Sequence, residues 1–160
     1  RVSKADPRIA LIGELDELNS WIGVALAHAP GPEVAHALVR VQHDLFDLGG
    51  ALSLPGAALL SEPHLKRIDA AATALNKDLA PLKEFILPGG APLIAFLHVA
   101  RTVCRRAERS AVASLAGSEV GAFAIAYLNR LSDFLFIAAR FDARRLGVTE
   151  TMWKHEHGAG

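Results

Sequence analysis

The chain has 160 residues, of which 51% are hydrophobic, which is enough for one domain with a single core. Basic and acidic residues number 17 each, so the net charge is zero and there is no general attraction for nucleic acid or an anionic membrane. An anionic ligand must therefore be held by a local cluster of cations. No apolar run approaches the roughly 18 residues that a membrane span needs. The lone Cys104 fits a reducing compartment and no signal peptide is visible, so we expect a cytoplasmic protein without membrane or nucleic-acid partners.

Helical periodicity dominates the first half of the chain, and strand-like alternation is nearly absent. Asp6 followed by Pro7 is typical of an N-cap and first helical residue, and Pro-Gly-Pro at 30–32 ends this first helix. A second helix is predicted over about 33–52, before the turn at Pro55-Gly56. A third is predicted from Ser61 to Pro81. The predicted inward stripe of the first helix is Ile9, Ile12, Leu15, Leu18 and Ile22.

The second half of the chain begins with an irregular connection over 83–92, which is apolar around Phe85 and then turns on a proline and two glycines. Helices are predicted over about 92–115 and 119–146, with Gly147 at the C′ position of the last one. The tail that follows has no clear pattern. Five helices joined by short connections predict an all-α protein, an up-and-down five-helix bundle. Frequent alanine allows close helix approach and favours packing between subunits.

The segment 101–109 carries four arginines and a glutamate, interrupting an otherwise apolar helix. On a helix, Arg101, Arg105 and Glu108 lie one turn apart on a common face, with Arg109 beside them. One interpretation is a solvated face with internal ion pairs. Two features favour a ligand instead: every cation is an arginine, suited to bidentate phosphate contacts, and the flanking residues are strongly apolar. The pattern therefore indicates a site for a triphosphate.

Polar residues also recur on one stripe of the last predicted helix, at Asn129, Asp133 and Arg140, with Phe136 between them. Polar groups edged by leucines must find partners inside the fold. Two interpretations remain open: a ligand site, or a structural network in which, for instance, Asp133 pairs with Arg130.

The first predicted helix presents Asp16, Asn19 or Ser20, and Gly23 on one face. Its spacing alone indicates an exposed polar face. A second interpretation is that Asp16 pairs with an arginine across a helix or subunit interface.

Several other chemistries are excluded by spacing. Glu33-x-x-His36 occurs once, whereas a di-iron bundle needs two such motifs and two more glutamates. The seven histidines and one cysteine show no zinc spacing, and there is no P-loop and no Gly-x-Gly-x-x-Gly. We therefore predict no protein-bound metal. Cys104 is interpreted as a small buried residue rather than a nucleophile.

Five motifs, in order along nearly the whole chain, resemble those of the PduO-type cob(I)alamin adenosyltransferases. They are RVSK at 1–4, GELDELNS at 13–20, FILPGG at 85–90, CRRAER at 104–109 and NRLSD at 129–133. No single motif is decisive, but five in register are specific. The resemblance implies a five-helix bundle, a homotrimer, and ATP at the subunit interface with the corrinoid beside it.

The resemblance also implies roles for individual residues. Phe85 would lie against the corrin face from which the lower axial base leaves, and Asp16 and Arg101 would form a salt bridge between subunits. The family carries a Gly/Thr-rich ATP-binding loop before the Arg-Val-x-Lys segment, which we expect to be missing here, so that 1–160 is a single domain with an irregular tail at 148–160. The residues implied in ATP binding are Lys4, Arg105, Arg106, Ala107, Glu108, Arg109 and Asn129.

The implied reaction agrees with what the chain lacks. Cob(I)alamin is itself a strong nucleophile, so the protein needs no activated serine or cysteine. Expulsion of triphosphate from the 5′ carbon of ATP needs charge stabilisation, which the arginines, Lys4 and a magnesium ion brought with ATP would supply. A different interpretation stays open, a non-catalytic helical oligomer that binds nucleotide or corrinoid as a carrier or sensor. A di-iron oxidase is disfavoured by the missing carboxylates.

Overall fold

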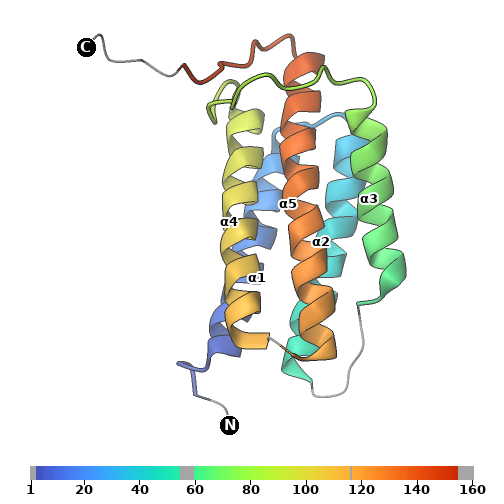
Figure 1. The fold of residues 1–160 in the computed structure, drawn as a ribbon. Coiled ribbons are helices and arrows are strands. Elements are labelled where there is room, and N and C mark those ends of the chain that lie inside the picture. The colour runs from blue at the N-terminus through green and yellow to red at the C-terminus, as the bar shows by residue number, and fades with distance from the viewer. Residues whose placement is uncertain (1–2, 55–59, 116, 155–160) are drawn as a thin grey trace, which may run out of the picture.

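The computed structural model of the chain is an up-and-down bundle of five α-helices (Figure 1). It describes residues 3–54, 60–115 and 117–154. The all-α, five-helix prediction is confirmed. The helices are α1 (Pro7–Ala27), α2 (Pro32–Ser53), α3 (Glu62–Asn76), α4 (Pro92–Leu115) and α5 (Glu119–Arg145). Predicted features that lie outside the described residues are Arg1 and Val2 of the first motif, the Pro55-Gly56 turn, and His155 and His157 of the tail.

Helix boundaries follow the capping signals of the sequence closely, with one exception. The Asp6 side chain accepts a hydrogen bond of 2.9 Å from the Arg8 amide, and Gly147 has a φ of 66° just after α5. However, α3 ends at Asn76 rather than at Pro81. Pro81 disfavours the helical conformation of Ala80, the residue before it. The Arg140 side chain of α5 donates a hydrogen bond to the Ala80 carbonyl at 2.9 Å. This stretch is therefore bound to α5 and does not continue α3.

The predicted inward stripe of α1 is wrong at its beginning. Ile9 is 38% exposed, whereas Leu11, which was not on the stripe, is fully buried. The reason is that α1 is apolar on more than one side, so periodicity does not select a single face. Ile9 and Ile12 instead line a groove of about 540 Å³ between α1 and α2, together with Leu45 and Phe46.

Helix α5 is the centre of the bundle, with α3 on one side of it and α4 on the other, and α4 also packs against α1 (Figure 1). By length and composition alone α5 is apolar enough to cross a membrane. Its apolar residues are core residues here: Tyr127, Leu128, Leu131, Phe134 and Leu135 are all fully buried. The same composition therefore serves a helix that is covered by others on several sides.

The connection between α3 and α4 and the tail after α5 lie at the same end of the bundle (Figure 1). The tail has no helix, as expected, but it pairs with the connection. Ile86 and Met152 form an isolated antiparallel bridge, and the Leu87 amide donates to the Thr151 carbonyl at 2.8 Å. This pairing has no sequence signal in either segment.

Candidate active site

The arginine cluster of α4 is organised around one carboxylate. Arg105 and Glu108 form an ion pair of 2.6 Å, and the Asn129 side-chain amide of α5 donates to the other Glu108 oxygen at 3.0 Å. The Arg109 guanidinium donates to the Arg105 carbonyl at 3.0 Å. The side chain of Arg105 is 47% exposed while that of Glu108 is 13% exposed, so Glu108 orients a cation that still reaches solvent. This is the common face that the helical spacing predicts.

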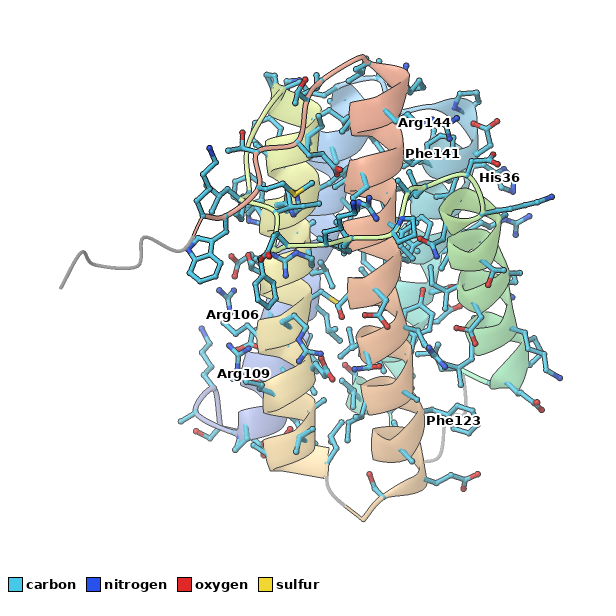
Figure 2. The ribbon with its side chains drawn as sticks, turned by 45° about the horizontal axis from the view of Figure 1, so that its top comes forward. His36, Arg106, Arg109, Phe123, Phe141 and Arg144 are labelled. Carbon is cyan, nitrogen blue, oxygen red and sulfur yellow. The ribbon has the colours of Figure 1, made fainter. Side chains whose placement is uncertain are left out.

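Arg106 lies on a different side of α4 and is neutralised within the chain. It contacts the Glu17 carboxylate of α1 and lies 3.8 Å from Glu14. Figure 2 shows Arg106 and Arg109 about one turn apart at the outer edge of the bundle. Ala107, between the two faces, is fully buried. The run 105–109 therefore divides into cations that face solvent, one arginine fixed to α1, and one packing residue.

Arg101 is a half-buried cation without an acidic partner in the described part of the chain. Its guanidinium carbon lies 6.0 Å from the centre of the Phe136 ring, and its Nε is buried without a hydrogen-bond partner. Burial, and after it the charge of Arg105, lowers the pKa of Arg101. Asp16 is exposed on α1, and no ion pair involving it is found among residues 3–54, 60–115 and 117–154. A single protomer does not bring Asp16 and Arg101 into contact.

His98, one turn before Arg101, was not selected from the sequence. Its side chain is 4% exposed, its ring lies 6.1 Å from that of Phe136, and its Nδ1 has no hydrogen-bond partner. Burial, and after it the charge of Arg101, lowers the pKa of His98 to about 4. His98 is therefore neutral at physiological pH. The i, i+3 spacing to Arg101 was the available signal, but a histidine in an apolar helix usually belongs to the core.

The polar stripe of α5 does not form the predicted internal pair. Arg130 pairs with Asp69 of α3 at 3.2 Å, and Asp133 is exposed, so the interpretation in which Asp133 serves Arg130 is wrong. Arg140 is the buried member and binds Glu150 at 3.3 Å. Together Arg130, Asp133 and Arg140 line a groove of about 610 Å³ between α3 and α5.

Phe85 stands on the connection before α4 and is 78% exposed. Phe85 is therefore not a residue of the bundle core. Its ring meets that of Trp153 edge-on at 6.4 Å, and Gly90 behind it has a φ of 98°, which a residue with a Cβ rarely adopts. Leu87, Met152 and Trp153, on the two paired segments, are also exposed, so Phe85 belongs to an apolar patch rather than standing alone.

The predicted residues are spread along α4 and around its two ends. The Phe85 loop precedes the N-terminus of α4, Arg101 to Arg109 span about 12 Å of its length at 1.5 Å per residue, and Lys4 is an exposed residue just before α1. The N-terminus of α1 lies at the end of the bundle where α4 finishes (Figure 1). The candidate site residues are therefore distributed along α4, with an apolar end at Phe85, before its N-terminus, and a cationic end at Arg105 and Arg109.

A second polar network, also missed from the sequence, lies between α2, α3 and α5. The buried Asp44 accepts hydrogen bonds of 2.8 Å from both Tyr127 and Arg67. Burial, and after it the charge of Asp44, raises the pKa of Tyr127. Asp44 also groups with Asp47 and His64 at a spacing that a metal ion accepts. Because both Asp44 oxygens are already hydrogen-bonded, we interpret the group as structural.

Comparisons with known proteins identify the family of the chain. The sequence profile of the family described as "Cobalamin adenosyltransferase" matches residues 1–142. The "Cobalamin adenosyltransferase" of Cupriavidus metallidurans is 48% identical over 157 residues, which cover 98% of this chain and 85% of that protein. The "Corrinoid adenosyltransferase" of Bacillus subtilis is 38% identical over 161 residues, 96% of this chain and 83% of that protein.

Among solved structures, a Phe→Ala variant of the PduO-type ATP:corrinoid adenosyltransferase from Lactobacillus reuteri, in complex with cobalamin and ATP, superimposes with a TM-score of 0.85. It is 31% identical, and the match covers 96% of this chain and 90% of that one. These matches extend over almost the whole chain, as the five motifs do. The chain therefore belongs to the cobalamin adenosyltransferase family, of the PduO type, and is a transferase.

Proposed function

We propose that the protein transfers the 5′-deoxyadenosyl group of ATP to the cobalt of cob(I)alamin, releasing triphosphate and forming adenosylcobalamin. The observation that carries this assignment is the pair of exposed groups that α4 connects. The half-exposed Arg105 suits a triphosphate, and the exposed Phe85, on the connection before α4, suits the apolar face of a corrin. One PduO-type relative binds both ligands: a variant of the Lactobacillus reuteri protein was solved in complex with cobalamin and ATP.

The transfer is a displacement at carbon. The electron pair of Co(I) forms the Co–C5′ bond, the C5′–O bond breaks, and its electron pair leaves with the triphosphate, so the cobalt ends formally as Co(III). No protein nucleophile is required, which agrees with Cys104: it is fully buried, and burial raises the pKa of its thiol. The tasks left to the protein are to position the substrates, stabilise the leaving group and exclude water.

The leaving triphosphate is assigned to Arg105 and Arg109, with Lys4 approaching from the chain segment before α1. Glu108 fixes the direction of Arg105 through their 2.6 Å ion pair, and Asn129 completes the contact from α5. Arg106, which Glu14 and Glu17 already hold, would add positive potential and anchor α1 to α4. Ala107 supports this surface from the core.

Magnesium is assigned as the counter-ion that enters with ATP. Arg105 and Asn129 already hydrogen-bond the two carboxylate oxygens of Glu108. The magnesium ligands would therefore be phosphate oxygens and water rather than Glu108. When bound, the ion would share the neutralisation of the triphosphate.

A homotrimer with the site at the subunit interface is supported by two features of the protomer. Arg101 is a half-buried cation without an acidic partner in the described residues, and such a charge is costly unless paired. The groove between α1 and α2 exposes Phe46 by 70% and lies beside Asp16. A neighbouring subunit that covers this groove would bring Asp16 toward an Arg101 across the interface.

Phe85 is assigned to the corrinoid, where it would occupy the face that the lower axial base leaves and keep water from the metal. Its 78% exposure provides the apolar surface for this role. We assign the protein to the cytoplasm, where Cys104 would stay reduced, and we propose no nucleic-acid or membrane partner.

One assay separates catalysis from a carrier or sensor role. Protein, ATP and chemically reduced cobalamin are mixed without oxygen, and the absorption spectrum is followed for conversion to the adenosyl form. Catalysis predicts conversion with many turnovers per protein and release of triphosphate in equal amount. Binding without conversion would contradict the proposal and favour the carrier or sensor. His36→Ala, on the side of the bundle away from Arg106 in Figure 2, is a control that should convert normally.

A further inference from the structure

The tail that follows α5 is held against the Phe85 loop by several independent contacts. The Leu87 amide donates to the Thr151 carbonyl at 2.8 Å, and the Trp153 amide donates to the Phe85 carbonyl at 2.7 Å. Two hydrogen bonds therefore flank the Ile86–Met152 bridge, and one of them involves the backbone of Phe85 itself. A residue whose own carbonyl is hydrogen-bonded has less freedom to change the direction of its side chain.

The side chains add to the backbone pairing. The Trp153 ring meets the Phe85 ring edge-on, at 6.4 Å between centres and 66° between planes, a favourable arrangement for two aromatic rings. Phe85 is 78% exposed and Trp153 is 42% exposed. Without the tail, Phe85 would have no aromatic neighbour among the ring contacts of the described residues. Trp153 is thus placed to decide which way the Phe85 ring points.

The tail is itself anchored to the body of the bundle. Arg140, which is 8% exposed, donates both to Glu150 at 3.3 Å and to the carbonyl of Ala80 at 2.9 Å. It therefore holds the tail and the α3–α4 connection at once. A methyl group at Gly90 would come within 3.1 Å of Val148, which shows how closely the two segments pack.

The match to the family profile covers residues 1–142 and stops before this segment. The mechanism above uses no residue beyond Asn129, so the tail has no assigned part in it. Its contacts nevertheless converge on the one exposed aromatic residue that the mechanism assigns to the corrinoid. Hydrogen bonds, an aromatic contact and a buried arginine together hold this irregular segment against the connection that carries Phe85.

We propose that residues 148–153 are a positioning element of the corrinoid site, and that Trp153 is a positioning residue that holds Phe85 in the direction from which it displaces the lower axial base. This inference rests on the proposed function only for the consequence at cobalt. The mechanical part, that the tail fixes the loop, concerns this chain alone.

The mechanical part is tested first, on the full chain without ligands. Amide hydrogen exchange is measured at Leu87 in the wild type and in Trp153→Ala. Because an aromatic pair contributes about 0.5–1.5 kcal/mol, we expect exchange to be about 2- to 10-fold faster in the variant. Leu146→Ala is the matched control: Leu146 is 44% exposed at the same end of the bundle but outside these contacts. Unchanged exchange at Leu87 in Trp153→Ala would overturn the proposal.

The consequence at cobalt is tested with cob(II)alamin, ATP and a one-electron reductant. Trp153→Ala should lower the rate from cob(II)alamin by about 2- to 10-fold and weaken the four-coordinate electron paramagnetic resonance signal, while the rate from pre-reduced cob(I)alamin and the melting temperature change little. Trp153→Phe, which keeps an aromatic edge, should restore most of the signal. A merely structural role would lower both rates together with the melting temperature.

A double variant decides whether Trp153 acts through Phe85. If it does, Phe85→Ala with Trp153→Ala is no slower from cob(II)alamin than Phe85→Ala alone. Additive losses would show that Trp153 acts independently and would overturn the positioning role. If the wild type fails to convert cob(I)alamin at all, the proposed function is wrong, and the exchange experiment at Leu87 still decides whether the tail positions the loop.

Discussion

The two ends of the site are held in place in different ways. At the cationic end, Arg105 and Glu108 lie on one helix and pair at 2.6 Å, with Asn129 on the adjoining helix at 3.0 Å from the same carboxylate. At the apolar end, Phe85 stands outside the helices and is restrained by a tail that follows α5. Helical spacing fixes the first arrangement, whereas the second depends on pairing between segments more than sixty residues apart, such as Leu87 and Thr151. Substitutions should therefore separate the ends: the cationic end controls ATP, and the apolar end controls the state of the corrinoid.

The largest effect is expected at the cationic end. Arg105→Ala removes a charged contact to the leaving triphosphate, and loss of such an electrostatic contact costs about 2–4 kcal/mol in the transition state, roughly 30- to 900-fold in kcat/KM for ATP. The melting temperature of Arg105→Ala should equal that of the wild type, because the Arg105 side chain is half exposed. Steady-state kinetics with cob(I)alamin at varied ATP measure this. The control is Arg40→Ala, which replaces an exposed arginine of α2 and should leave activity at the wild-type level. Full activity in Arg105→Ala would show that Arg105 does not bind the phosphates.

The next effect concerns His98, which lies between the two ends. Its pKa is lowered to about 4 in the folded protein, below the value of 6.5 that it has without the fold. Protonation therefore favours the unfolded chain: the stability is complete above pH 6.5 and is lost as the pH falls toward 4. The loss should reach about 3 kcal/mol at most.

Denaturant unfolding between pH 7 and pH 4 measures the loss at His98. In His98→Gln, which cannot titrate, this part of the pH dependence should disappear, although the variant's stability at pH 7 also changes. The difference in slope between the two proteins is the quantity of interest. Identical slopes would mean that His98 is protonated as easily in the folded chain as in the unfolded one.

The third effect is expected at the apolar end. Phe85→Ala removes an apolar surface worth about 1.5–3 kcal/mol, so the rate from cob(II)alamin should fall by about 10–100-fold while the rate from pre-reduced cob(I)alamin changes much less. The melting temperature should hardly move, because Phe85 is 78% exposed. Electron paramagnetic resonance of cob(II)alamin with enzyme and ATP should show less of the four-coordinate species. An undiminished signal would exclude Phe85 from the mechanism.

The same contrast explains what was predictable from the sequence. Caps such as Asp6-Pro7 and the C′ glycine at 147 are local, so the helix boundaries they predict agree with the structure. The common face of Arg105 and Glu108 is also local and is confirmed. The end of α3 was not predictable, because Arg140, sixty residues later, binds the Ala80 carbonyl.

At the site, too, contacts between residues far apart in the sequence could not be predicted. Trp153 has no pattern around it, and its contact with Phe85 depends on the way two irregular segments meet. The partner of Arg130 is Asp69 of α3 rather than Asp133, although Asp133 is nearer in sequence. His98 is unremarkable in sequence and gains its lowered pKa only from burial beside Arg101. Each of these depends on tertiary packing rather than on spacing.

The smallest effect is expected between Asp16 and Arg101, and it tests whether the site extends beyond one protomer. If they pair across an interface, Asp16→Ala and Arg101→Ala should each weaken both assembly and activity, since either leaves a partly buried charge unpaired. The double variant should lose less than the sum of the two. A coupling of about 0.5–3 kcal/mol is expected for groups in direct contact.

The wild type, the two single variants and the double variant form a double-mutant cycle. Sedimentation at several protein concentrations measures assembly for each of the four proteins, and steady-state kinetics gives kcat/KM for ATP. Arg101 also lies over the Phe136 ring, so a loss confined to that contact would appear in Arg101→Ala alone and leave Asp16→Ala unaffected. Exchanging the two charges, with Asp16→Arg and Arg101→Asp in one chain, should recover part of the assembly if the pair is intermolecular. Zero coupling in both assembly and activity would show that Arg101 is stabilised by its own protomer, and that the unpaired Nε beside Phe136 has another explanation.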